Sequence, residues 1–205
     1  MTDRRSLSDI PETAGKLQLE KIDQAAKSGV DWIQLREKDL SGKQLAEFAT
    51  AAMWRVAGAS AILVNDRLDV ACAVKAAGVH LGEHSLPVKE AKRFASDSGA
   101  GKHFLVGASV HSREAALQAE EDGADYVIFG PVYATPSKEK FGQPQGLTKL
   151  QDVCRRLKIP VLAIGGITLE NARECLKAGA TGIAAIRLFQ DAANLPALVK
   201  ELHGA

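Results

Sequence analysis

The sequence predicts an α/β fold, a TIM (β/α)8 barrel, from three observations. Short apolar segments alternate with stretches rich in Ala, Lys and Glu, and alternating strands and helices imply a parallel sheet. Seven such units follow one another, close to the eight that close a barrel. Neither GxGxxG nor GxxxxGK[ST] is present, which disfavours a doubly wound sheet. The expected strands span residues 32–35, 61–64, 79–81, 104–108, 126–129, 160–164 and 182–186.

Several expected strands are preceded by the same type of helix end. A charged last turn is followed by a glycine or another small residue, which is the usual signal that stops a helix. The glycines concerned are Gly29, Gly78, Gly123 and Gly179.

The barrel's first strand is not recognisable. The chain opens on Thr2-Asp3-Arg4, which is typical of the polar exit of a strand. Without its apolar part, the neighbouring strands would keep unpaired edges. Either the start has been placed too late, or the barrel closes in another way; the first explanation is favoured.

Length and composition indicate one domain over residues 1–205. The net charge of +1 gives no sign of a nucleic-acid or membrane partner. No apolar run reaches the roughly 18 residues of a membrane helix, and no signal peptide is seen. Three cysteines without a CxxC pair favour reduced thiols in the cytoplasm. Expected partners are small phosphorylated substrates and, if the protein oligomerises, a second copy in a homodimer.

Strand exits are where barrels of this type place their active sites. Side chains alternate along a strand, so Gln34, Arg36 and Lys38 share one face and Ile33 and Leu35 take the other. Two cations and an amide at a strand exit suit an anionic substrate.

Further polar residues follow other strands. Asn65 and Asp66, Ser109 and His111, and Lys138 in a Pro-containing loop lie at such exits. The cations, the amides and one carboxylate together suit a diphosphate held with Mg²⁺. Taken alone, Asp66 is also compatible with a helix N-cap, and His111 and Lys138 with solvated surface positions.

A Gly165-Gly166 turn follows the seventh barrel strand. Loops after strands seven and eight commonly bind phosphate in such barrels, and glycines let backbone N–H groups approach phosphate oxygens. Two anion sites imply two phosphorylated substrates or one long one. His80 and His84 have the spacing of a helical zinc pair, but they lie across a strand exit, so no zinc site is expected.

These motifs, in this order, resemble those of thiamine phosphate synthase and of its sister, the TenI-type thiazole tautomerase. The resemblance runs from Thr2 to about Leu188. The segments that carry it are QLREK (34–38), NDR (65–67), GVHLG (78–82), SVHS (109–112), GPV (130–132), TPSK (135–138) and AIGGI (163–167).

The resemblance implies a synthase that joins hydroxymethylpyrimidine diphosphate to thiazole phosphate and releases diphosphate. It implies one Mg²⁺ per subunit on Asp66, with Ser85 at the position of the usual second carboxylate. The implied roles are diphosphate binding for Arg36, Lys38, Asn65 and Lys138, pyrimidine binding for Gln34 and Ser109, and thiazole phosphate binding for Thr135, Ser137, Gly165 and Gly166.

Two departures from the synthase pattern keep other functions open. Ser85 replaces a carboxylate, and Arg187 stands where a small residue usually ends the eighth strand. The first alternative is a tautomerase, in which His111 would move the proton. The second is a non-catalytic relative that only binds phosphate ligands. The retained cations favour the synthase, because the tautomerase has no diphosphate for them to hold.

Overall fold

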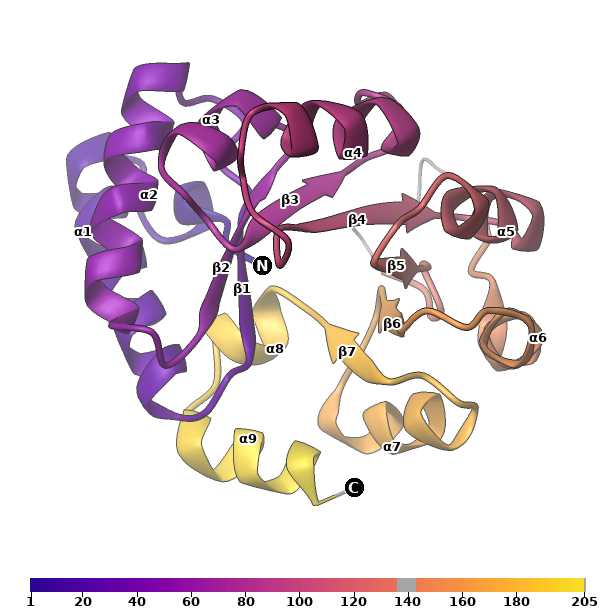
Figure 1. The fold of residues 1–205 in the computed structure, drawn as a ribbon. Coiled ribbons are helices and arrows are strands. Elements are labelled where there is room, and N and C mark those ends of the chain that lie inside the picture. Colours follow the sequence, from indigo (N-terminus) through magenta and orange to yellow (C-terminus); the bar gives the residue numbers. More distant parts are fainter. Residues whose placement is uncertain (136–142, 205) are drawn as a thin grey trace.

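The computed structural model describes residues 1–135 and 143–204 and contains a curled sheet of seven parallel strands (Figure 1). Each strand pairs with the next one along the chain, as repeated β–α units require. The strands are β1 (Trp32–Leu35), β2 (Ala61–Asn65), β3 (Gly78–Leu81), β4 (Leu105–Val110), β5 (Tyr126–Phe129), β6 (Val161–Ile164) and β7 (Gly182–Ala184).

Helices cover the outside of this sheet (Figure 1). Local signals begin several of them: Ser41 and Thr168 form capping boxes at the starts of α2 (Gly42–Val56) and α7 (Leu169–Lys177), which satisfy backbone donors of the first turn. No helix in the described residues is long and apolar enough to cross a bilayer. The helices are η1 (Arg4–Ser6), α1 (Pro11–Lys27), α2 (Gly42–Val56), α3 (Leu68–Ala73), α4 (Val88–Asp97), α5 (Arg113–Glu121), α6 (Gly146–Arg156), α7 (Leu169–Lys177), α8 (Arg187–Gln190) and α9 (Leu195–His203).

Strands β1 to β5 bury both of their faces, whereas the residues of β7 are half-buried. Val64, Val79 and Val127 belong to the large core cluster that includes helix residues. Leu63 and Ile128 belong to a separate small cluster. Burial on both sides explains why the strands are nearly continuous apolar runs.

The expected barrel architecture is confirmed, with small differences in the strand ends. The segment expected at 182–186 is shorter, since β7 ends at Ala184. Arg187 therefore begins α8 instead of ending a strand.

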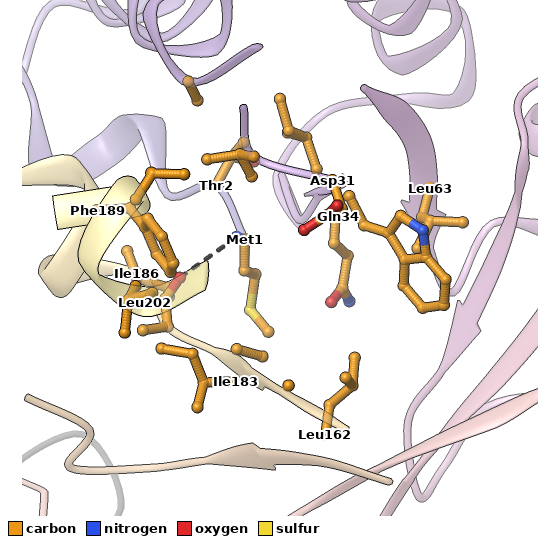
Figure 2. A pocket seen from close by; sticks show the side chains of 18 of the residues that line it. Met1, Thr2, Asp31, Gln34, Leu63, Leu162, Ile183, Ile186, Phe189 and Leu202 are labelled. Atoms are coloured by element: carbon orange, nitrogen blue, oxygen red, sulfur yellow. Dashed lines mark hydrogen bonds between the residues drawn. The ribbon is translucent and has the colours of Figure 1, made fainter. Parts of the chain in front are cut away.

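An apolar cavity of about 490 Å³ lies between β1 and β7. Figure 2 shows Met1, Gln34, Leu162 and Ile183 around it. Among the described residues β1 and β7 do not pair with each other. The Thr2 amide donates to the Gln34 carbonyl at 2.9 Å, and the Met1 amine donates to the Ala185 carbonyl at 3.3 Å. Residues 1 and 2 thus occupy one end of the space that an eighth strand would fill.

Two buried polar groups that line this cavity lack part of the hydration or hydrogen bonding that they would have in water. Burial lowers the pKa of the Met1 amine to about 6, because desolvation disfavours its charged form. The Oε1 atom of Gln18 is buried and accepts no hydrogen bond from the described residues. An extended segment in the cavity would supply backbone donors and acceptors to both strand edges.

We predict that five apolar residues fused before Met1 complete the sheet and stabilise the protein. Burial of apolar side chains contributes about 1.5–3 kcal/mol each, and ordering the segment costs roughly 1–2 kcal/mol per residue. A net gain of about 2 kcal/mol would raise Tm by roughly 4–8 °C. Thermal unfolding followed by circular dichroism measures this gain. The control is a Gly/Ser extension of equal length, and an equal Tm for both extensions would contradict the prediction.

Candidate active site

The amides of Gln34 and Asn65 meet at the exits of β1 and β2. Gln34 Nε2 donates to Asn65 Oδ1 at 2.8 Å, and only 6% of Gln34 is exposed. This bond fixes both amide orientations. Among the described residues, the Oε1 atom and the second N–H of Gln34 and the NH₂ group of Asn65 therefore stay available for a ligand.

A second polar group lies deeper, on β3, β4 and β5. His80 Nε2 is 2.8 Å from Ser109 Oγ, and His80 Nδ1 is 3.1 Å from the Tyr126 hydroxyl. Burial lowers the pKa of His80 to about 3, so its imidazole is neutral at physiological pH. The sequence pattern indicates His80 only as one half of a possible zinc-binding pair and does not predict it in the active site. The signal was present as a single polar side chain inside an apolar strand.

His111 lies just beyond β4, and its Nδ1 atom contacts the carbonyl oxygen of Gly130. A carbonyl can only accept, so Nδ1 carries the hydrogen. This contact leaves Nε2 as the ring nitrogen that can exchange a proton with a ligand. This position suits an acid–base role better than a purely solvated one.

Arg36 and Lys38 follow β1 as expected, in a turn that Thr2 holds by hydrogen bonds. Thr2 Oγ1 accepts from the Arg36 amide at 3.0 Å and donates to Glu37 Oε1 at 2.5 Å. Glu37 is 5% exposed. On either side of the buried Glu37, Arg36 is half-buried and Lys38 is exposed. In the described chain neither cation forms an ion pair with a carboxylate.

Glu37 is a structural group that sequence reasoning missed. It accepts from the Arg4 amide at 3.3 Å, and the Arg4 guanidinium lies 3.6 Å from it and 2.7 Å from Asp39. Burial raises the pKa of Glu37 in spite of the hydrogen bonds from Thr2 and Arg4, which act in the opposite direction. Removing one member of such a buried pair typically costs about 3–5 kcal/mol.

Asp66 lies at the exit of β2, where its exposed carboxylate can reach a ligand. Its φ of +66° is uncommon outside glycine, although Asp tolerates this region. The Asp66 amide donates to the His80 carbonyl at 2.8 Å, which holds the turn in place. Ser85 Oγ accepts from the Gly82 amide at 2.8 Å.

The oxygen atoms that Asp66 and Ser85 offer as ligands set a limit on metal binding. The described residues contain no cluster of three or more His, Cys, Asp or Glu side chains. Mg²⁺ is often bound by one or two carboxylates, water and substrate phosphate oxygens. Asp66 therefore fits an ion that arrives with a phosphorylated substrate, and does not fit a closed protein cage.

The Gly165-Gly166 turn has no room for side chains. The φ angles are +96° and +64°. A Cβ atom on Gly165 would lie 2.4 Å from Pro131 Cβ, and one on Gly166 would lie 2.5 Å from the Ala134 carbonyl oxygen. The turn leads into the first turn of α7. Exposed backbone donors at a helix N-terminus favour a phosphate group.

The remaining expected site residues are less defined. Thr135 is half-buried and follows the exit of β5. Ser137 and Lys138 lie outside the described residues. Arg187 is exposed on the first turn of α8, beyond the exit of β7.

Residues 8–189 match the sequence model of the family described as thiamine monophosphate synthase. This chain belongs to that family. Thiamine-phosphate synthase of Methanoculleus marisnigri is 43% identical over 180 residues, which cover 87% of this chain and 83% of the relative. The enzyme of Chlorobium phaeovibrioides is 45% identical over 164 residues, covering 80% and 76%.

Solved structures agree with this assignment. Thiamine phosphate pyrophosphorylase from Pyrococcus furiosus has a TM-score of 0.80 and 36% identity, with 91% of this chain and 88% of that chain covered. A 3-hexulose-6-phosphate synthase has a TM-score of 0.68 at 19% identity, covering 91% and 93%. The second likeness concerns the fold alone.

We predict that Gly166→Ala destabilises the protein because its Cβ atom meets backbone in a left-handed turn. The expected cost is about 1–3 kcal/mol. Gly15→Ala is the matched control, since Gly15 lies within α1 with no atom within 4 Å of a Cβ; it should be stabilising by roughly 0.5–1 kcal/mol. Urea denaturation measures both. Equal effects of the two substitutions would contradict the prediction.

Proposed function

We propose that this chain is a thiamine phosphate synthase that couples hydroxymethylpyrimidine diphosphate with thiazole phosphate. The observation that carries the proposal is the pair of cations Arg36 and Lys38, free of carboxylate partners in the described chain. They follow β1 directly after Gln34, whose amide is bonded to that of Asn65. Relatives named thiamine-phosphate synthase support the same reaction. The enzyme class is therefore a transferase.

The chemistry needs stabilisation of a leaving group more than an acid or a base. The bond between the pyrimidine methylene carbon and the diphosphate oxygen breaks, and its electron pair leaves with diphosphate. The thiazole nitrogen then donates its lone pair to the carbocation. Arg36, Lys38, Lys138 and the Asn65 NH₂ group hold the developing negative charge, and such fixed charges lower the barrier.

Mg²⁺ would be held by Asp66, with substrate oxygens and water completing its coordination. When bound, the ion neutralises diphosphate oxygens. We propose one ion per subunit. Ser85 offers only a neutral hydroxyl, so the ion is held more weakly than it would be between two carboxylates.

The two ring substrates are assigned to separate parts of the strand exits. Gln34 and Ser109 hold the pyrimidine. The thiazole side is held by Thr135 and Ser137, with its phosphate at the Gly165-Gly166 turn, and Arg187 adds a positive charge at the neighbouring exit.

His111 supports a second candidate function. Its Nε2 atom, oriented by the contact between Nδ1 and the Gly130 carbonyl, suits the proton transfer of a thiazole tautomerase. His111→Ala would abolish isomerisation under this alternative. Isomerisation by the wild type without any coupling would favour the tautomerase over the synthase. Binding of phosphorylated ligands without either reaction would leave a non-catalytic relative.

We predict that the purified protein forms thiamine phosphate from both substrates in the presence of Mg²⁺. Lys38→Ala should reduce kcat/KM for the pyrimidine diphosphate by about 10²-fold or more, as removal of one charge-stabilising group typically does. Lys43→Ala is the matched control, an exposed lysine on α2, and should be nearly neutral. Product formation is followed by chromatography. Absence of product at high enzyme concentration would overturn the synthase proposal.

We predict that Ser85→Asp lowers the Mg²⁺ concentration needed for half-maximal coupling by roughly tenfold, because a second carboxylate adds charge to the ion site. Titration of the coupling rate with MgCl₂ measures this. Ser98→Asp, at the exposed C-terminal end of α4, controls for added charge. An unchanged Mg²⁺ dependence in Ser85→Asp would argue that this loop does not contact the ion.

A further inference from the structure

The ring of Tyr126 is fixed inside the curled sheet by its neighbours. On the adjacent strand, Gly107 is its register partner, and a Cβ atom there would lie 2.0 Å from Tyr126 Cζ. Trp32 packs edge-on against the ring with centroids 4.8 Å apart. The ring is 1% exposed. The hydroxyl of Tyr126 therefore has one defined position.

That hydroxyl must donate its proton to an acceptor, because a buried donor without a partner is unfavourable. Within the described residues its hydrogen-bond partner is His80 Nδ1, at 3.1 Å. If Nδ1 carried a hydrogen instead, the Tyr126 proton would have no acceptor in this part of the chain. The Tyr126 O–H group thus donates, and Nδ1 accepts.

The tautomer of His80 follows from that direction. A ring nitrogen that accepts a hydrogen bond carries no hydrogen, so with Nδ1 accepting from Tyr126 the ring hydrogen of His80 is on Nε2. Nε2–H then donates to Ser109 Oγ at 2.8 Å. The Ser109 hydroxyl accepts this bond and has no second partner among the described residues, so its own proton is directed to a ligand.

We propose that Tyr126 and His80 are positioning residues that fix Ser109 as a hydrogen-bond donor to the bound substrate. This inference rests on the proposed function, which brings an aminopyrimidine to Ser109. The site then selects a heteroaromatic ring with an unprotonated nitrogen facing the serine. An analogue with C–H at that ring position offers no lone pair and is rejected, since the serine proton would lose its acceptor.

The donor–acceptor direction of the hydrogen bonds that join Tyr126, His80 and Ser109 is tested first by ¹⁵N NMR of the histidine ring nitrogens in the free protein. The signals of His80 are identified by their loss in His80→Gln. The expected result is a neutral ring with hydrogen on Nε2 in the wild type and a mixture of tautomers in Tyr126→Phe, which lacks the donor to Nδ1. Hydrogen on Nδ1 in the wild type, or an unchanged tautomer in Tyr126→Phe, would overturn the proposal.

Kinetics test the consequence for the substrate. Tyr126→Phe should raise KM for the pyrimidine diphosphate about 3–10-fold, the value of one hydrogen bond, with kcat and the KM of thiazole phosphate within about twofold. It should also reduce the preference for the natural ring over the C–H analogue. His80→Gln keeps an N–H donor near Ser109 and should preserve more of that preference than His80→Leu.

Thr50→Val is the control for deletion of a hydroxyl, because Thr50 lies on the exposed side of α2 and its hydroxyl donates to the Ala46 carbonyl of the same helix. It should leave both KM values unchanged. Equal preference for the two rings in wild type and Tyr126→Phe would overturn the positioning role. If the wild type couples no substrates, the proposed function fails, while the NMR measurement still decides the hydrogen-bond direction.

Discussion

The parallel, in-register pairing of consecutive strands is the constraint on which the site depends. Register places Gln34 of β1 opposite Leu63 of β2, and Asn65 opposite His80 of β3. Since every second side chain turns inward, each strand contributes one residue to a given interior level. Leu63 shares its level with Gln34, and Ile128 shares its level with Ser109, so apolar and polar side chains stand next to each other around the interior. Polar groups from distant parts of the chain therefore meet without any loop having to fold over them.

The polar level is rigid because most of its members are bonded before a ligand arrives. The Gln34–Asn65 pair, the Tyr126–His80–Ser109 series and the Glu37 contacts leave few free rotations. Such preorganisation reduces the cost of ordering side chains on binding. The cations Arg36 and Lys38 differ, since backbone contacts fix their turn while their charged ends stay unpaired in the described chain. This combination suits a leaving group whose charge grows during the reaction.

The fold and the strand exits could be predicted because the order of apolar and polar residues along the sequence indicates them directly. Apolar runs ended by glycine or polar residues located every strand, and β1 and β5 agree with their expected bounds. His80 and Glu37 could not be assigned from sequence. His80 looks like a polar interruption of an apolar run, and its role depends on Tyr126, 46 residues away. Glu37 stands in a charged run that suggests solvent, whereas its burial depends on Thr2 and Arg4.

The position of Thr2 links the chain's beginning to substrate binding. Its amide holds the end of β1, and its hydroxyl bridges Glu37 and the Arg36 backbone. Trimming the first few residues would remove Thr2 and Arg4 together, leave Glu37 buried without these partners, and free the turn that presents the cations. Changes at this end of the chain would therefore alter stability and ligand affinity together.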